Sequence, residues 1–130
     1  TAGLLGVSAW WGFPKERTDF WEPWSPEKVE DYLGEGRTVY VDFTARWCAT
    51  CQVNKRVVFS SDEVLETFGA MDIAALKADW TNRDDRITRR LEELGKAAVP
   101  VNLIYFEGNP EPIILPEILT PEIVLNALQK

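Results

Sequence analysis

The feature that most constrains this chain is its single pair of cysteines, Cys48 and Cys51, which follow directly after the apolar run 38–43. The β-branched and aromatic residues of that run predict a buried strand. A strand that delivers C-x-x-C to the start of a helix is typical of thiol–disulfide exchange. Backbone N–H groups at the helix start would stabilise a thiolate at Cys48. Cys51, one turn on, can reach that sulfur and close a disulfide, so we expect one sulfur to attack and the other to resolve.

Other uses of C-x-x-C are disfavoured by the composition. A structural zinc site needs four ligands, usually Cys or His, and the chain has no third cysteine and no histidine. We therefore expect no metal. Haem attachment requires C-x-x-C-H, and Gln52 stands at the histidine position. A purely structural disulfide stays open as an alternative, although its very short loop would remove little unfolded-chain entropy.

Length and charge narrow the class of protein. With 130 residues the chain is long enough for one domain with a hydrophobic core. A net charge of −7 argues against a nucleic-acid partner and favours a soluble domain. It is compatible with protein partners that carry a complementary basic rim.

Residues 1–24 differ from the rest and are predicted to be a Trp-rich linker or tail. They hold four of the six tryptophans, and the first residue is Thr, so we expect a piece of a longer protein. The apolar run 3–13 is too short to span a bilayer and lacks the features of a signal peptide. Two interpretations stay open: a tail whose aromatics pack on the domain, or the end of a preceding membrane segment.

Residues 25–130 are predicted to form a single α/β domain. Caps and apolar spacing predict helices at about 25–33, 49–58, 60–68, 84–94 and from 120 onward, and strands at 38–43, 73–79, 99–106 and 111–115. The early strands favour parallel pairing through crossovers, and the last two favour a hairpin. We expect a mixed central sheet with helices packed on it.

The segment Val41-Asp42-Phe43-Thr44-Ala45-Arg46-Trp47-Cys48-Ala49-Thr50-Cys51 and the pair Val99-Pro100 resemble the active-site strand and the cis-proline of the thioredoxin superfamily. Together with 57–60 and 77–82, they are more narrowly similar to the C-terminal periplasmic domain of the DsbD family of thiol:disulfide interchange proteins. The resemblance covers about 25–130. It implies a thioredoxin fold, with a mixed sheet flanked by helices on both faces.

The same resemblance implies a function. A DsbD-type domain is a protein-disulfide reductase that takes electrons from a transmembrane domain and passes them to an N-terminal periplasmic domain of the same longer chain. It implies no cofactor beyond a redox-active Cys48–Cys51 disulfide, partners that are protein thiols or disulfides, and a periplasmic location in an inner-membrane protein. Two alternatives remain: a free-standing thioredoxin-like protein for cytochrome c maturation or disulfide isomerisation, and a non-catalytic binding domain with a structural disulfide.

Carried over by position, the resemblance makes Cys48 the exposed nucleophile and Cys51 the buried resolving thiol. Pro100 would be the cis-proline, Trp47 the flanking indole and Asp42 the acid below the sulfurs. Ala49 and Thr50 replace the Gly-Pro of ordinary thioredoxins, and Val101 follows the proline where many relatives have Thr. Val99 and Pro100 would leave backbone groups free for a substrate strand.

Asp42 also stands out on its own, because Asp is unfavourable inside a strand. A desolvated carboxylate there could take the proton of Cys51 during exchange. Lys77 would pair with Asp42 if their strands are neighbours, and otherwise it is a solvated charge. Lys55, at a position that is acidic in the DsbD-type domain, would stabilise the Cys48 thiolate if it lies close.

Overall fold

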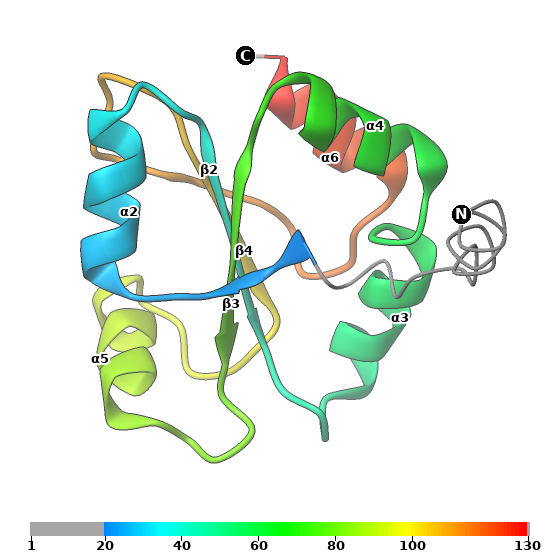
Figure 1. Cartoon of the computed structure of the whole chain (residues 1–130). Coiled ribbons are helices and arrows are strands. Elements are labelled where there is room, and N and C mark those ends of the chain that lie inside the picture. Colours follow the sequence, from blue (N-terminus) through cyan, green and yellow to red (C-terminus); the bar gives the residue numbers. More distant parts are fainter. Residues whose placement is uncertain (1–19, 130) are drawn as a thin grey trace, which may run out of the picture.

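The computed structural model describes residues 20–129, and the predictions for residues 1–19 lie outside this range. Its centre is a five-stranded sheet in the order β1-β3-β2-β4-β5 (Figure 1). The strands are β1 (Glu22–Pro23), β2 (Val39–Thr44), β3 (Ala74–Asp79), β4 (Val101–Tyr105) and β5 (Ile113–Ile114). β2 runs parallel to β3 and antiparallel to β4, so the predicted mixed sheet is confirmed.

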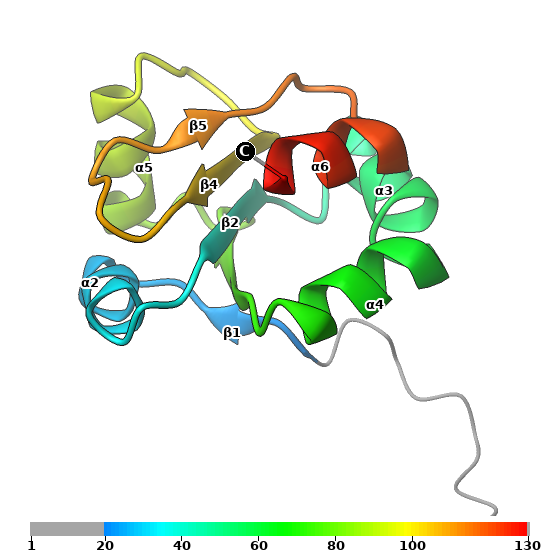
Figure 2. The same cartoon turned by 90° about the horizontal axis from the view of Figure 1, so that it is seen from above.

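Helices cover both faces of this sheet, as the sequence predicted. They are α2 (Pro26–Gly34), α3 (Ala49–Val57), α4 (Asp62–Ala70), α5 (Asp85–Glu93) and α6 (Pro121–Leu128). Figures 1 and 2 place α2 and α5 on one face and α3, α4 and α6 on the other. The side chains of Ser25, Ser61, Asp84 and Thr120 each accept a hydrogen bond from a backbone N–H of the first turn, which explains why four of the helices begin where they do.

Alternation along the central strands divides the core into two layers. In β2, Val39, Val41 and Phe43 face α2 and α5, whereas Tyr40 belongs to the layer beneath α4 and α6. Asp42 has the same parity as Tyr40, so it points to the face that also carries α3. The sheet therefore places a carboxyl group on the side of the cysteine-bearing helix.

The sequence predicted no strand before Ser25, and the structure adds one. β1 pairs in parallel with β3, and the Trp24 N–H donates to the Lys77 carbonyl at 2.9 Å. The ring of Trp21 packs edge-on against Phe59, with 5.2 Å between the ring centroids, and against Tyr40. Residues 20–24, which the sequence analysis grouped with the N-terminal segment, are therefore packed on the domain.

The C-terminal hairpin is shorter than predicted. The strand after Pro100 runs only over β4, and its partner β5 is reduced to two residues. Proline explains the start of β4, because it supplies no N–H to the ladder. Pro112 and Pro116 flank the short segment 113–115, in which only Ile113 and Ile114 pair with β4 as β5.

Candidate active site

The two cysteines lie at the start of α3 and form a disulfide, with their Cα atoms 5.2 Å apart. Cys48 is the N-cap of this nine-residue helix, and its Sγ atom accepts a hydrogen bond from the Cys51 N–H at 3.1 Å. A sulfur atom placed there receives an N–H donor and the positive end of the helix dipole. Both favour a thiolate at Cys48 over one at Cys51 when the pair is reduced.

The exposure expected for Cys48 needs correction. The resemblance implied an exposed attacking sulfur, but Cys48 is 8% exposed and Cys51 is 4% exposed. Both cysteines are buried because they pack with Ala45 and Val99 in a small apolar cluster. Cys48 is still the more exposed of the two cysteines, as expected. The expected contrast between an exposed and a buried sulfur is wrong, because both residues are buried.

The peptide bond between Val99 and Pro100 is cis, as the resemblance implied. The carbonyl oxygen of Val99 lies 3.8 Å from Cys48 Sγ. The loop before β4 therefore brings backbone groups next to the Cys48 sulfur. Backbone groups in this position can hydrogen-bond an extended chain whose own sulfur approaches Cys48.

Trp47 is half exposed and is held from a neighbouring loop. Its indole Nε1–H donates to the carbonyl of Thr81 at 3.0 Å, and the guanidinium of Arg83 lies 4.8 Å from the ring centroids of both Trp47 and Trp80. The sequence analysis did not single out Arg83. Its stacking depends on a loop 36 residues away in the chain, and no local pattern signals it.

Ala49 and Thr50 occupy the first turn of α3, between the two sulfurs. Ala49 is exposed and Thr50 is half-buried. Neither side chain is charged. Within the motif, Cys48 is therefore influenced by the helix dipole alone and not by a charged neighbour between the two cysteines.

Asp42 lies between two polar neighbours in the sheet. It stands opposite Lys77 of β3 on one side and opposite Asn102 of β4 on the other. Desolvation raises the pKa of Asp42 to about 7, against smaller lowering effects from the Lys77 charge and the Asn102 amide. A carboxyl group with this pKa can exchange a proton near neutral pH, which ordinary Asp residues cannot do.

Lys55 and Lys77 both border a cavity of about 80 Å³ beside Asp42. Lys77 is half-buried, and its position opposite Asp42 satisfies the condition that the sequence analysis set for an interaction. Lys55 is exposed on α3. Gln52, the residue after Cys51 in the first turns of α3, lines the same cavity as Asp42.

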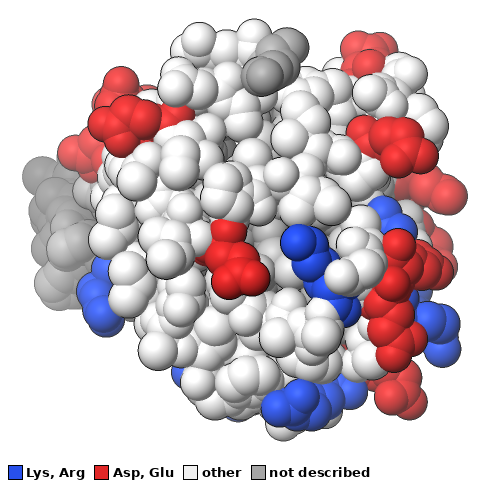
Figure 3. Space-filling model, turned by 180° about the vertical axis from the view of Figure 1, so that it is seen from behind, with Lys and Arg blue, Asp and Glu red and all other residues white. Residues whose placement is uncertain are grey.

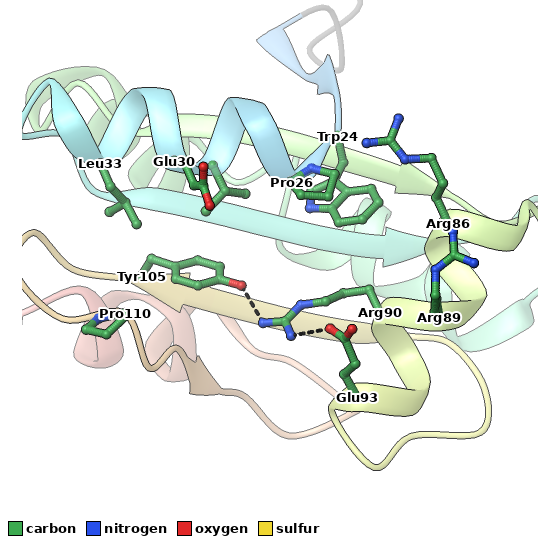
Figure 4. Close-up of a pocket in the computed structure, with 11 residues that line it drawn as sticks. Trp24, Pro26, Glu30, Leu33, Arg86, Arg89, Arg90, Glu93, Tyr105 and Pro110 are labelled. Carbon is green, nitrogen blue, oxygen red and sulfur yellow. Dashed lines mark hydrogen bonds and ion pairs between the residues drawn. The ribbon is translucent and has the colours of Figure 1, made fainter.

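A larger cavity, of about 400 Å³, lies on the opposite face between α2 and α5 (Figure 4). Two of the guanidinium groups that line it have partners: Arg90 contacts Glu93 and the Tyr105 hydroxyl, and Arg86 pairs with Glu27 at 2.8 Å. It is separated from the cysteines by the sheet. We therefore assign the chemistry to the cysteine end and not to the larger cavity.

Charged side chains are unevenly distributed on the rear face of the molecule. In Figure 3, acidic and basic groups gather toward the side where α5 lies, while much of the rest of the view is uncharged. Exposed apolar side chains include Trp47 beside the motif, Val53 and Val57 along α3, and Ile118 in the loop before α6.

Within residues 20–129, no three Cys, His, Asp or Glu side chains come together as a metal site. None of the helices described is long and apolar enough to cross a bilayer.

A family model described as thioredoxin-like matches residues 20–106, a span that holds the cysteines, Asp42 and the cis-proline. The chain belongs to the thioredoxin-like family. Membership fits the fold, because a thioredoxin from Thermus thermophilus superposes with a TM-score of 0.68 at 19% identity, over 84% of this chain and 83% of that one. The thioredoxin fold that the sequence predicted is therefore confirmed.

DsbD proteins are among the relatives of this thioredoxin-like chain. It is 33% identical over 92 residues to a Thiol:disulfide interchange protein DsbD from Ralstonia nicotianae, and 22% identical over 93 residues to one from Campylobacter jejuni. These matches cover 67% and 72% of this chain, but only 14% and 16% of the two DsbD proteins. The oxidised DsbD C-terminal domain of Neisseria meningitidis superposes with a TM-score of 0.59 at 16% identity, over 79% of this chain and 85% of that one.

Proposed function

We propose that this thiol–disulfide oxidoreductase works as the periplasmic electron-transfer domain of a DsbD-like membrane disulfide reductase. The observation that carries the thiol chemistry is the hydrogen bond from the Cys51 N–H to Cys48 Sγ at the start of α3. It gives the two sulfurs different roles, which a purely structural disulfide does not need. The cis-proline loop beside Cys48 supports the same assignment.

The reaction is a two-electron exchange that needs no cofactor. The Cys48 thiolate attacks one sulfur of a partner disulfide, so that a mixed disulfide forms and one partner thiolate leaves. The Cys51 thiolate then attacks Cys48 Sγ, which restores the Cys48–Cys51 disulfide and releases the second partner thiolate. The partner gains two electrons, and its two thiolates take up the two protons that the Cys48 and Cys51 thiols lose.

Asp42 is the proton acceptor for Cys51 in this scheme. The resolving attack requires a thiolate at Cys51, and a buried thiol resists ionisation. Because desolvation raises the pKa of Asp42 to about 7, this carboxyl group can take a proton at neutral pH and release it afterwards. The cavity that Asp42 shares with Gln52, next to Cys51, supports this role.

The DsbD assignment rests on the relatives. They are named as thiol:disulfide interchange proteins, and the chain spans about one seventh of their length. A domain of this size would receive electrons from a transmembrane domain and pass them to an N-terminal periplasmic domain. On this proposal the partners are domains of one longer chain, and the location is periplasmic.

The thiol chemistry is tested by mixing the reduced protein with insulin and following insulin reduction. We expect turnover in the presence of dithiothreitol, and none after Cys48→Ala. Equal insulin reduction by the wild type and Cys48→Ala would favour a binding domain with a structural disulfide.

The DsbD assignment is tested with a partner. The reduced protein is mixed with the oxidised N-terminal domain of the Ralstonia nicotianae relative, and exchange is followed by tryptophan fluorescence. We expect exchange with this domain to be at least tenfold faster than with insulin, since a cognate surface adds to the intrinsic thiol rate. Equal rates would favour a free-standing thioredoxin-like protein.

A further inference from the structure

Asn102 is a polar residue in the middle of an apolar strand. It is 1% exposed, and its neighbours along β4 are Val101, Leu103 and Ile104. A buried amide in a central strand is unfavourable unless both its ends find partners. Leu or Val at this position would fill the space without that requirement. The amide therefore indicates a role beyond packing.

One end of this amide is held in place. The hydroxyl of Tyr40, itself fully buried, donates a hydrogen bond to Asn102 Oδ1 at 2.7 Å. The other end, Nδ2, makes no hydrogen bond with any residue that the structure describes. Because Tyr40 occupies the carbonyl end, the N–H₂ group is directed away from the tyrosine as a donor without an acceptor.

Asp42 lies next to this unpaired donor. Asn102 is opposite Asp42 in the antiparallel β2–β4 ladder, and Tyr40 and Asp42 have the same parity on β2. Side chains that oppose each other across a ladder stand within contact range. Asn102, Asp42 and Lys77 thus form one row across three adjacent strands, on the face that carries α3.

We propose that Asn102 is a positioning residue for Asp42: when Asp42 ionises, its carboxylate accepts a hydrogen bond from the otherwise unpaired Nδ2 group, while the Tyr40 hydroxyl fixes the orientation of the amide. The inference rests on the proposed function, in which Asp42 accepts the proton of Cys51. Asn102 does not touch the sulfurs. It acts by making the charged form of Asp42 accessible near neutral pH.

The electrostatics around Asp42 agree with this role. Desolvation raises the pKa of Asp42, and the Asn102 amide and the Lys77 charge lower it. The other titratable groups facing Asp42 are the Tyr40 hydroxyl from its own strand, Lys55 from α3, and Arg46 and Asp79, which border the same small cavity. Lys77 supplies a positive charge on the β3 side of Asp42. Asn102 supplies a hydrogen-bond donor to the Asp42 carboxylate on the β4 side.

The test is the ionisation of Asp42 itself, followed by ¹³C NMR of its carboxyl carbon in the oxidised protein. In that state no cysteine titrates, so the pKa of Asp42 is measured without any turnover. We expect Asn102→Leu to raise the Asp42 pKa by about one unit, a tenfold change in its ionisation constant. Tyr40→Phe, which removes a single oxygen atom, should raise it by a smaller amount, because the amide then loses its fixed orientation.

Asn54→Leu is the matched control. Asn54 is also a buried asparagine, but its amide joins α3 to the loop before α6, through the Glu117 carbonyl and the Leu119 N–H. It should leave the Asp42 pKa unchanged. If Asn102→Leu does not fold, Tyr40→Phe decides the question alone.

An unchanged or lowered Asp42 pKa in Asn102→Leu, or in Tyr40→Phe where only that variant folds, would overturn the proposal. In the reduced protein, the acidic limb of the insulin-reduction rate should shift to higher pH by the same amount as the Asp42 pKa. Failure of the proposed function would appear separately, as a wild type that does not reduce disulfides while its Asp42 still responds to Asn102→Leu.

Discussion

Asp42, whose pKa desolvation raises to about 7, stands directly opposite Lys77 on the neighbouring parallel strand. The lysine lowers the pKa of the carboxyl group without cancelling the effect of desolvation. Because its pKa is raised in the folded state, Asp42 reduces the stability of the fold when it is ionised. The ionisation of Asp42 therefore has a consequence for stability, apart from the proton transfer proposed above.

We expect the oxidised wild type to lose stability as the pH rises from about 4 to about 7. Below pH 4 the carboxyl is protonated in both states. The pKa of Asp42 is 3.8 in the unfolded chain and about 7 in the folded protein. At a pH between these two pKa values, the unfolded chain releases a proton that the native state keeps. Asp42→Asn should remove this dependence, with a gain of at most about 4 kcal/mol above pH 7.

Urea unfolding of the oxidised protein at pH 4, 6 and 8 measures this effect. Asp31→Asn, at an exposed carboxylate on α2, is the control and should follow the wild-type curve. An Asp42→Asn variant that is no more stable than the wild type at pH 8 would contradict the desolvated carboxyl.

Asp42 should also raise the thiolate pKa of the cysteine pair, because a nearby carboxylate disfavours a second negative charge. We expect Asp42→Asn to lower the apparent pKa of Cys48 and to slow turnover at neutral pH. Lys55→Gln should change this pKa little, because an exposed lysine is screened by water. The rate of cysteine alkylation, measured against pH, gives the Cys48 pKa in the wild type, Asp42→Asn and Lys55→Gln. A clear rise of the Cys48 pKa in Lys55→Gln, with none of the expected fall in Asp42→Asn, would make Lys55 the tuning residue.

The roles of the two sulfurs can be separated by trapping. Cys51→Ala keeps the backbone N–H that faces Cys48 Sγ, so Cys48 should still attack, and the mixed disulfide should accumulate. Cys48→Ala should trap little, because Cys51 lies inside the first turn of α3 and lacks the N-cap position that favours a thiolate at Cys48. Each variant is mixed with an oxidised partner, and non-reducing electrophoresis gives the ratio of mixed disulfide formed by Cys51→Ala to that formed by Cys48→Ala. Similar trapping by both variants would exclude the assignment of Cys48 as the nucleophile.

The contact between Arg83 and Trp47 predicts a smaller effect at the rim of the site. Arg83→Ala removes a cation stacked on two indoles, and should cost about 0.5–1 kcal/mol of stability. It should also change the emission of Trp47, while Arg83→Lys should retain part of the interaction. A double-mutant cycle with Trp47→Leu isolates the pairwise energy, and a coupling energy of zero would show that the stacking contributes nothing.

The packing of Trp21 predicts where truncation becomes harmful. Removal of residues 1–13 should leave the melting midpoint almost unchanged, as the lack of periodicity in that segment predicts. Removal of residues 1–24 should cost several degrees, because it takes away β1 and the rings against Phe59 and Tyr40. Trp21→Ala alone should cost about 2 kcal/mol. A similar loss from both truncations would place stabilising contacts before Phe20.

The sequence predicted the parts of this molecule that depend on local patterns. The C-x-x-C motif, the cap at Ser25 and the apolar alternation around Asp42 each depend on neighbouring residues, and each predicted element is present. β1 was missed because Glu22-Pro23 has no pattern of its own and becomes a strand only by pairing with residues 76–77.

The site was less predictable than the fold for the same reason. Lys77 and Asp42 become neighbours only once β2 and β3 pair in register. Arg83 and Asn102 carry no motif. A signal for Asn102 existed, since it is the one polar residue in the run 99–106, and a single polar residue in a buried strand calls for a partner.

The two outermost strands of the described sheet are each only two residues long, and one of them contains Pro23. Long, regular sheet borders recruit strands from other molecules, which leads to aggregation. A protein that must repeatedly accept foreign polypeptide beside its sulfurs would be at particular risk. Borders as short as β1 and β5 disfavour the growth of the sheet from one molecule to the next.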